Sequence, residues 1–339
     1  FMFNKKVILI TGGTGSFGKT FVKFLLKNFK PKKLIIFSRD EMKQFEMSNM
    51  FSANKFKCLR YFIGDVRDQE RLKIATKDVD FIIHAAALKQ VPAAEYNPIE
   101  CIKTNILGTQ NVVMAALENK VKKVLALSTD KAVNPINLYG ATKLASDKLI
   151  ISANNFVGSK SKFSLVRYGN VIGSRASVIP FFMNLIKNSS TFLPITEKDM
   201  TRFWITINQG IELVNHAFND MKGGEIYIPK IPSIKITDLA KAMGPKLKQK
   251  IIGIRPGEKI HESLTSKDES SNVLMFKKYY VITPNYSLAN LKKYKKNFKG
   301  EIGKKVEQNF EYNSGTNKHF LTINEIKDLN NFNLKNDTL

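Results

Sequence analysis

The first half of the chain alternates short apolar runs with longer segments in which apolar positions recur every three or four residues. An apolar run of strand length followed by a segment of helical period indicates a strand and a helix that packs on it. The predicted strands are residues 7–11, 33–37, 59–63, 79–83, 123–128 and 163–168. This alternation predicts an α/β protein with a doubly wound parallel sheet, whose ligands bind at the carboxyl ends of the strands.

Beyond residue 168 the alternation becomes irregular. The expected elements there are a loop over 169–180, a helix over 181–187, an extended piece over 200–205, a helix capped by Thr206, a strand over 225–228, a helix over 236–243 and a strand over 251–254. Residues 1–170 plus about 206–235 are therefore expected to form the sheet domain, and residues 171–205 plus about 236–339 a smaller C-terminal domain.

The first predicted strand leads directly into a glycine-rich loop, G-G-T-G-S-F-G at 12–18, and then into a helix. Gly12 permits a tight turn, Gly15 lets the backbone approach a phosphate, and Gly18 allows close packing of the helix. A diphosphate binds favourably at the positive end of such a helix. The order of strand, loop and helix predicts a dinucleotide site.

The second strand ends about 20 residues after this loop, where the fold places the group that reads the adenosine ribose. An acidic residue there would accept a hydrogen bond from the 2′-hydroxyl of NAD, but the sequence reads Ser38-Arg39-Asp40-Glu41. A guanidinium and a hydroxyl suit a 2′-phosphate, which favours NADP. The alternative is that Arg39 pairs with neighbouring acids while Asp40 caps the next helix.

Polar and small residues also follow the next two strands. Asp65 is placed to accept a hydrogen bond from adenine, although Asp65 or Asp68 could equally cap the following helix. The small residues 85–87 after His84 leave room for a flat cofactor, which accounts for this position better than a metal site. No metal site is predicted.

A polar pair, Thr104 and Asn105, lies within the apolar stripe of a long helix predicted over 98–118. Such a pair usually forms hydrogen bonds to a neighbouring strand or to the active site.

The segment 128–143, S-T-D-K-A-V-N-P-I-N-L-Y-G-A-T-K, carries the densest chemistry of the chain. Tyr139 and Lys143 lie one helical turn apart on the same face. A nearby ammonium favours the phenolate, so Lys143 is expected to lower the pKa of Tyr139 and to make it a usable base. The adjacent Asp130 and Lys131 are catalytic candidates, and the alternative for them is a structural ion pair at the strand end.

The composition is strongly basic, with 54 Lys and Arg against 29 Asp and Glu, a formal net charge of +25. The lysines are scattered and become dense only late, without interleaved aromatic residues, so we favour a solvated basic surface that attracts anionic small substrates over a nucleic-acid site. Cys58 and Cys101 are expected to be free thiols. No apolar run approaches the roughly 20 residues of a membrane helix, and no signal segment opens the chain, which predicts a cytoplasmic protein with no membrane partner.

Five motifs occur together: T-G-G-T-G-S-F-G at 11–18, H-A-A-A-L-K at 84–89, S-T-D-K-A at 128–132, N-L-Y-G-A-T-K at 137–143 and I-R-P-G-E-K at 254–259. With these motifs the chain, from about residue 7 to 286, resembles the extended short-chain dehydrogenase/reductase superfamily. Within it, the chain is similar to the inverting UDP-N-acetylglucosamine 4,6-dehydratases. The resemblance implies a Rossmann-type sheet domain that binds NADP, a smaller C-terminal domain that binds substrate, and a homo-oligomer, either dimer or hexamer.

The resemblance also implies site residues. The cofactor positions are Gly12, Thr14, Gly15, Ser16, Phe17, Gly18, Ser38, Arg39, Asp40, Glu41, Lys43, Asp65, Val66, Ala85, Ala86, Lys89, Asn105, Tyr139, Lys143 and Val171. The substrate positions are Lys89, Asn170, Arg175, Ala176, Ser177, Val178, Ile179, Arg202, Arg255 and Glu258. Independently of the resemblance, the guanidinium groups of Arg175, Arg202 and Arg255 suit contacts with phosphate or uracil.

Relatives that retain the C5 configuration carry Thr-Asp-Glu where this chain has Thr129-Asp130-Lys131. The resemblance therefore implies C5 inversion and the first step of pseudaminic acid biosynthesis, for protein (flagellin) glycosylation. Lys131, if neutral, would act as base at C5, Asp130 as acid at C6, Tyr139 as base at C4, and Thr129 as a hydrogen-bond donor to the C4 oxygen. The alternatives are a retaining dehydratase, a C4 epimerase, or a non-catalytic cofactor or nucleic-acid binder.

Overall fold

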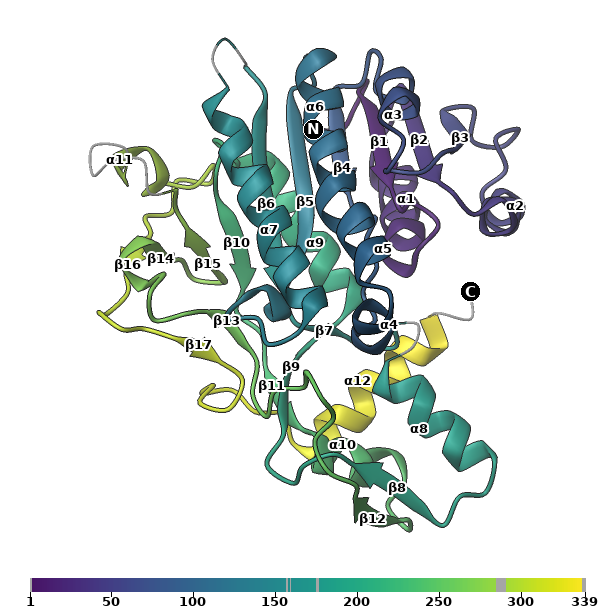
Figure 1. Cartoon of the computed structure of the whole chain (residues 1–339), viewed down its shortest axis with the longest axis vertical. Helices are drawn as coiled ribbons and strands as arrows, with labels where there is room; N and C mark the ends of the chain where they lie inside the picture. Colours follow the sequence, from purple (N-terminus) through teal and green to yellow (C-terminus); the bar gives the residue numbers. More distant parts are fainter. Residues whose placement is uncertain (1, 157, 159, 175–176, 285–290, 337–339) are drawn as a thin grey trace.

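A ten-stranded sheet forms the centre of the computed structural model, which describes residues 2–156, 158, 160–174, 177–284 and 291–336. The strand order is β16-β14-β15-β10-β6-β5-β4-β1-β2-β3 (Figure 1). The strands that pair in parallel are β1 (Val7–Thr11), β2 (Lys33–Ser38), β3 (Leu59–Ile63), β4 (Phe81–His84), β5 (Lys123–Thr129), β6 (Lys162–Tyr168) and β10 (Ile226–Pro229). The predicted doubly wound parallel sheet is confirmed.

Apolar residues explain why these strands lie at the centre. All five residues of β1, V-I-L-I-T, are buried, because helices cover a parallel sheet on both faces. Ile8 lies in register with Leu34 on one side and with Phe81 on the other. The carboxyl ends of these strands therefore meet at one edge of the sheet.

Helices cover both faces of this sheet. One layer consists of α3 (Gln69–Ala75), α6 (Gly108–Glu118) and α7 (Leu138–Ser152), and α6 contacts both of the others. The other layer contains α1 (Ser16–Asn28) and α9 (Ile207–Asp220), which contact each other. Figure 1 shows α6 and α7 in front of the sheet and α9 behind it. The capping of α9 by Thr206 is confirmed, since the Thr206 hydroxyl accepts a hydrogen bond from the Gln209 N–H in a capping box.

The long helix predicted over 98–118 is interrupted. The structure has α4 (Val91–Tyr96), α5 (Pro98–Ile102), a π-helical turn at Lys103–Leu107 and then α6. A π-helical turn inside an α-helix often marks a functional site. Here it carries Thr104 and Asn105, the polar pair singled out in the sequence.

A smaller unit has its own hydrophobic cluster, formed in part by Ile179, Phe182, Trp204, Leu239 and Ile326. Its elements are β7 (Asn170–Val171), α8 (Val178–Lys187), β8 (Phe192–Ile195), β9 (Thr201–Ile205), β11 (Ser233–Lys235), α10 (Ile236–Met243), β12 (Lys248–Ile251) and α12 (Ile323–Asn336). In Figure 1 this unit lies below the sheet, at the end where the parallel strands finish.

Three details differ from the sequence-based expectations. The predicted strand at 251–254 is wrong: β12 ends at Ile251, because its partner β8 ends at Ile195. Helix α8 begins at Val178, earlier than expected. Within the C-terminal region assigned to the smaller domain, β14 (Val273–Met275), β15 (Tyr279–Ile282) and β16 (Lys304–Lys305) extend the main sheet in antiparallel pairing.

The remaining described elements are α2 (Glu41–Met50), β13 (Ser263–Thr265), β17 (Tyr312–Asn313) and α11 (Leu291–Tyr294), besides short 3₁₀ turns. None of the helices in the described ranges is both long enough and apolar enough to cross a membrane.

Candidate active site

A cavity of about 900 Å³ opens at the carboxyl ends of the parallel strands and is lined by residues of both units. The predicted residues that line it are Gly12, Thr14, Gly15, Ser16, Phe17, Gly18, Ser38, Arg39, Asp40, Lys43, Asp65, Val66, Ala85, Ala86, Lys89, Thr129, Asp130, Lys131, Tyr139, Lys143, Asn170, Val171, Ser177, Arg255 and Glu258. Segments far apart in sequence thus meet around one space, as the strand-end rule predicts.

Of the predicted site residues that the structure describes, five do not line the cavity: Glu41, Asn105, Val178, Ile179 and Arg202. Arg175 and Ala176 lie outside the described residues. Ile179 is instead fully buried in the hydrophobic cluster of the smaller unit. The Arg202 guanidinium donates hydrogen bonds to the carbonyls of Thr201 and Ile260, at 2.7 and 3.0 Å.

The glycine loop forms one end of the cavity. Gly12 has φ of +65°, and a Cβ there would lie 2.9 Å from the backbone of Ala86, so the position requires glycine. Gly15 is the N-cap of α1, and no described side chain accepts a hydrogen bond from the first turn of this helix. Its amide groups can therefore bind an anion, as a dinucleotide diphosphate requires. The residues present fit such a cofactor.

Next to this loop, the end of β2 supplies the ribose side of the cavity. The Thr14 and Ser38 hydroxyls form a hydrogen bond of 2.8 Å, and the Arg39 side chain is 53% exposed. Arg39 Nη1 lies 3.6 Å from Asp65 Oδ2, and Asp40 caps α2 by accepting a hydrogen bond from the Lys43 N–H at 2.9 Å. The ion pair of Arg39 with an acidic neighbour and the helix cap by Asp40, which were the alternative to a phosphate contact, are thus both present. Arg39 nevertheless lines the cavity.

Asp65 is already engaged by a neighbour. It accepts hydrogen bonds from Arg67 Nε and Nη2, at 3.0 and 2.7 Å, and from the Arg67 N–H. Although burial raises the pKa of Asp65, these bonds more than offset it, and the net pKa is lowered. The N-cap of α3 is Asp68, which accepts a hydrogen bond from the Arg71 N–H at 2.9 Å. Of the two alternatives for helix capping, Asp68 takes that role.

His84, buried at the end of β4, is held by two threonine hydroxyls. Its Nδ1 lies 2.8 Å from Thr11 Oγ1, and its Nε2 lies 3.0 Å from Thr109 Oγ1. Burial, aided by the Lys143 charge, lowers the pKa of His84 to about 3, so the ring is neutral. No metal-binding group of three His, Cys, Asp or Glu occurs in the described parts of the chain.

Asn105 lies behind the wall of the cavity. Its Oδ1 accepts a hydrogen bond from the Leu88 N–H at 2.8 Å, and its Nδ2 donates one to the Leu88 carbonyl at 2.9 Å. The expectation that this residue has a hydrogen-bonding duty is confirmed. Asn105 shapes the segment that carries Lys89 instead of facing the cavity itself.

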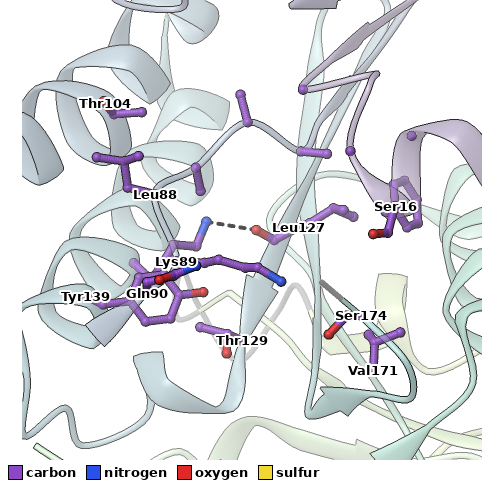
Figure 2. Close-up of a pocket in the computed structure, with 18 of the residues that line it drawn as sticks. Ser16, Leu88, Lys89, Gln90, Thr104, Leu127, Thr129, Tyr139, Val171 and Ser174 are labelled. Carbon is purple, nitrogen blue, oxygen red and sulfur yellow. Dashed lines mark hydrogen bonds between the residues drawn. The ribbon is translucent and has the colours of Figure 1, made fainter. Parts of the chain in front are cut away.

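The catalytic candidates gather at the end of β5 and the start of α7. Lys131 Nζ lies 3.0 Å from Asp130 Oδ1, and Thr129 Oγ1 donates to the same oxygen at 2.9 Å. A Cβ at Gly140 would overlap the carbonyl oxygen of Lys131, so α7 packs directly on this turn. Figure 2 shows Thr129 and the Tyr139 ring on one side of the cavity, beside Lys89, with Ser16 and Val171 across from them.

The pKa of Tyr139 differs from the expectation. Burial raises the pKa of Tyr139 to about 12, while the Lys131 charge and a hydrogen bond between the Tyr139 and Thr129 hydroxyls oppose this effect. The lowering that the sequence predicted is therefore not observed, and Lys143 Nζ instead donates a 2.8 Å hydrogen bond to the Leu127 carbonyl, drawn dashed in Figure 2. The cation that acts on the phenol is Lys131.

Lys131 rests as an ammonium, contrary to the neutral form that its role as a base requires. Burial lowers its pKa, but the Asp130 and Glu262 carboxylates more than offset this, and the net pKa is raised. Glu262 Oε1 lies 3.3 Å from Lys131 Nζ. Sequence reasoning missed Glu262, although it stands only three residues after Lys259 at the end of the I-R-P-G-E-K motif.

Several buried polar atoms at the cavity have no hydrogen-bond partner among the described residues. They are Thr104 Oγ1, Asp130 Oδ2, Asn170 Oδ1, Ser177 Oγ and Glu258 Oε2. Buried polar atoms are normally paired, so a group of unpaired ones around a single cavity indicates that a polar ligand binds there. Thr104, which the sequence singled out with Asn105 but did not place among the cofactor or substrate positions, also lines the cavity.

Residues 8–284 match the family described as polysaccharide biosynthesis protein. An inverting UDP-N-acetylglucosamine 4,6-dehydratase of Campylobacter jejuni (strain 81-176) is 59% identical over 97% of this chain and 98% of its own length. A UDP-glucose 4-epimerase of Rickettsia bellii (strain OSU 85-389) is 45% identical over 97% of this chain and 96% of its own.

Among solved structures, the X-ray structure of Pen from Bacillus thuringiensis is similar to this fold. Its TM-score is 0.86 at 37% sequence identity, and the match covers 97% of this chain and 99% of that one. The likeness therefore extends over both the sheet and the smaller unit.

Proposed function

This chain belongs to the polysaccharide biosynthesis protein family of extended short-chain dehydrogenases/reductases, and on that basis we propose that it is a nucleotide-sugar 4,6-dehydratase. Its proposed substrate is UDP-N-acetylglucosamine, and C5 is inverted. The products are UDP-2-acetamido-2,6-dideoxy-β-L-arabino-hex-4-ulose and water, a first step towards pseudaminic acid. The identity with inverting enzymes of the same specificity supports this proposal.

One observation carries the proposal. A carboxylate and an ammonium, Asp130 and Lys131, are in contact at 3.0 Å in the same cavity as Tyr139. Dehydration next to a ketone needs a base for one proton and an acid for the departing hydroxyl. An acid and a base that share one proton can supply both.

The proposed cofactor is NADP, held by the glycine loop, the first turn of α1 and the residues at the end of β2. The uncapped helix start suits the diphosphate, and Ser38 with Arg39 suits a 2′-phosphate. When bound, the cofactor supplies an acceptor for the C4 hydride and returns that hydride to C6, so no external reductant is consumed.

The residues of this chain would then move protons in a fixed order. Tyr139, ionised to the phenolate that the Lys131 charge favours, accepts the C4 hydroxyl proton, and the Thr129 hydroxyl turns from Asp130 Oδ1 to donate a hydrogen bond to the C4 oxygen. The C4 ketone acidifies C5, because the carbanion is stabilised as an enolate. Transfer of one proton from Lys131 to Asp130 across their 3.0 Å contact produces an amine and a carboxylic acid. The Lys131 amine then takes the C5 proton, the Asp130 acid protonates the leaving C6 hydroxyl, and Tyr139 returns a proton to the opposite face of C5.

The test is NMR of the product formed from UDP-N-acetylglucosamine in heavy water without added reductant. We expect a 4-keto, 6-deoxy sugar of inverted C5 configuration that carries deuterium at C5. Lys131→Ala should lower kcat at least about 1000-fold, as loss of a base does, while Lys295→Ala, an exposed lysine outside the cavity, should leave kcat unchanged. Elimination with deuterium uptake retained in Lys131→Ala would remove Lys131 as the base.

A C4 epimerase is the second candidate, because relatives named UDP-glucose 4-epimerase share 45% of their residues with this chain. The same NMR spectrum separates the two functions. An epimerase product keeps its C6 hydroxyl and takes no deuterium at C5, whereas a retaining dehydratase differs from our proposal in C5 configuration alone.

We also propose a cytoplasmic homo-oligomer, either dimer or hexamer, that associates through the helices beside the sheet. Large apolar side chains are exposed on this helical face, which supports the proposal: Tyr96 at 87%, Ile99 at 58%, Leu107 at 45% and Met114 at 38% exposure.

A further inference from the structure

Glu262 is a buried carboxylate beside the proposed base. Its side chain is 3% exposed, and its Oε1 lies 3.3 Å from Lys131 Nζ. Hydrogen bonds fix its backbone on both sides: the Glu262 N–H donates to Ser314 Oγ at 2.9 Å, and the Ser314 N–H donates to the Glu262 carbonyl at 2.8 Å. Glu262 is therefore a rigidly placed negative charge at the catalytic end of the cavity.

Lys259 connects Glu262 to the catalytic turn. Its Nζ lies 3.9 Å from Glu262 Oε2 and donates a 2.6 Å hydrogen bond to the carbonyl of Val133. Glu262 Oε2 has no hydrogen-bond partner among the described residues, so its contact with Lys259 is electrostatic. The two charges of opposite sign thus act on the same short turn.

Five groups face the Lys131 ammonium. They are Asp130 on its own turn, Glu262, the Arg202 guanidinium on β9, the Tyr139 phenol on α7, and Lys259 beyond Glu262. Only Asp130 and Glu262 carry negative charge, so these two oppose the loss of a proton from Lys131. Only Asp130 can also take part in proton transfer to the C6 hydroxyl, if the proposed function holds.

We propose that Glu262 is a positioning residue for the dehydration: it holds Lys131 against Asp130 and sets the pH at which this pair loses its shared proton, while Lys259 balances its charge. This inference rests on the role proposed above for Lys131. Glu262 need not touch the substrate, since it acts through Lys131.

The Asp130–Lys131 pair holds one proton that either residue can carry. With one shared proton, the pair is either ammonium and carboxylate or amine and carboxylic acid, and only the second form can act on C5 and C6. Loss of this proton to solvent leaves no acid and ends activity. A fixed negative charge at 3.3 Å from Lys131 Nζ makes that loss harder. Removal of the Glu262 charge should therefore lower the pKa at which the Asp130–Lys131 pair loses this proton, by about one to three pH units.

The direct test is NMR of protein labelled with ¹³C at lysine Cε, where the Lys131 signal is identified by its absence in Lys131→Met. In the wild type we expect the Lys131 signal to have the chemical shift of an ammonium up to about pH 10.5, the ordinary pKa of a lysine side chain. In Glu262→Gln it should titrate about one to three pH units below the wild type. Glu307→Gln, an exposed carboxyl outside the cavity, should behave as the wild type.

The pH profile of kcat provides a second readout, in which two variants should shift in opposite directions. The loss of kcat at alkaline pH should occur at lower pH in Glu262→Gln. It should occur at higher pH in Lys259→Met, where the Glu262 charge is no longer balanced. Glu262→Asp keeps the charge and should retain the wild-type limb at a reduced kcat. Structural damage alone would lower kcat in all three variants without shifting their limbs in opposite directions.

The two proposals fail in different ways. If the Lys131 signal titrates identically in Glu262→Gln and in the wild type, the positioning role is overturned whatever the activity. If the signal shifts as expected but the wild type does not turn over UDP-N-acetylglucosamine, the role of Glu262 in setting the charge of Lys131 stands and the proposed substrate is wrong.

Discussion

At the scale of single residues, Arg39 and Asp40 are neighbours with different surroundings. Asp40 caps α2 by accepting the Lys43 N–H, and its pKa is lowered by hydrogen bonds from Lys43 Nζ and from that N–H. Arg39 keeps a half-exposed side chain at the cavity, near Asp65. A 2′-phosphate that binds here would therefore meet Arg39, whose guanidinium can form two hydrogen bonds with it.

Arg39→Ala tests the choice of cofactor. We expect the variant to bind NADP about tenfold more weakly, equivalent to about 1.4 kcal/mol, with little change for NAD. Calorimetric titration with both cofactors measures this, and Arg60→Ala is the matched control, since Arg60 is exposed on β3 and does not line the cavity. Equal losses for NADP and NAD would contradict a phosphate contact.

Much of the candidate site could be predicted from sequence, because its parts are linear motifs at strand ends. The glycine loop and the turn that carries Lys131 are of this kind. Glu262 could not be found in this way, since it reaches Lys131 from 131 positions further along the chain. Asp130 and Glu262 together raise the pKa of Lys131 against the effect of burial, so the folded structure favours the ammonium over the neutral lysine considered from the sequence.

At the scale of elements, the π-helical turn between α5 and α6 is the feature that most affects the cavity wall. It lets Asn105 face the backbone of Leu88, while Thr104 in the same turn faces the cavity. Apolar periodicity does not distinguish such a turn from a continuous helix, which is why the sequence predicted one helix over 98–118. The paired strands were predicted well because strand length and burial dominate there, whereas 251–254 was predicted wrongly from an apolar run whose isoleucines are half exposed.

Asn105→Ala should destabilise the protein by about 1–3 kcal/mol, because it leaves the Leu88 N–H and carbonyl without their partner. Chemical denaturation followed by circular dichroism measures this loss. Asn188→Ala is the matched control, since Asn188 is exposed and its side chain donates a long hydrogen bond of 3.4 Å to Asn184 Oδ1. A free energy of unfolding equal to that of the wild type in Asn105→Ala would show that Leu88 finds other partners.

At the scale of the whole molecule, two hydrophobic clusters build the two units, and the cavity is lined by residues from both. The exposed apolar side chains on α4, α5, the turn that follows and α6 belong to neither cluster, and the proposed assembly would bury them against a second copy of the chain. Charge does not forbid this contact, because the face also carries Glu100 and Lys103, which pair with each other at 3.4 Å.

The double variant Tyr96→Glu with Ile99→Glu tests the proposed assembly. If the face joins copies of the chain, sedimentation equilibrium should show the mass falling to that of one chain, 38.4 kDa. Met42→Glu is the control, because Met42 is 67% exposed on α2, away from this face. An oligomer that persists in the double variant would place the interface elsewhere.

The contact between Gly140 and the turn at Lys131 has an evolutionary consequence. The backbone of this turn is fixed by the tight packing of α7 on one side and by the hydrogen bond from Lys259 to Val133 on the other. A change of side chain at position 131 can therefore alter the chemistry without altering the path of the chain. If Lys131 takes the C5 proton from one face and so leaves the other face for reprotonation, a single substitution at position 131 would exchange one C5 epimer of the product for the other, with little cost to folding.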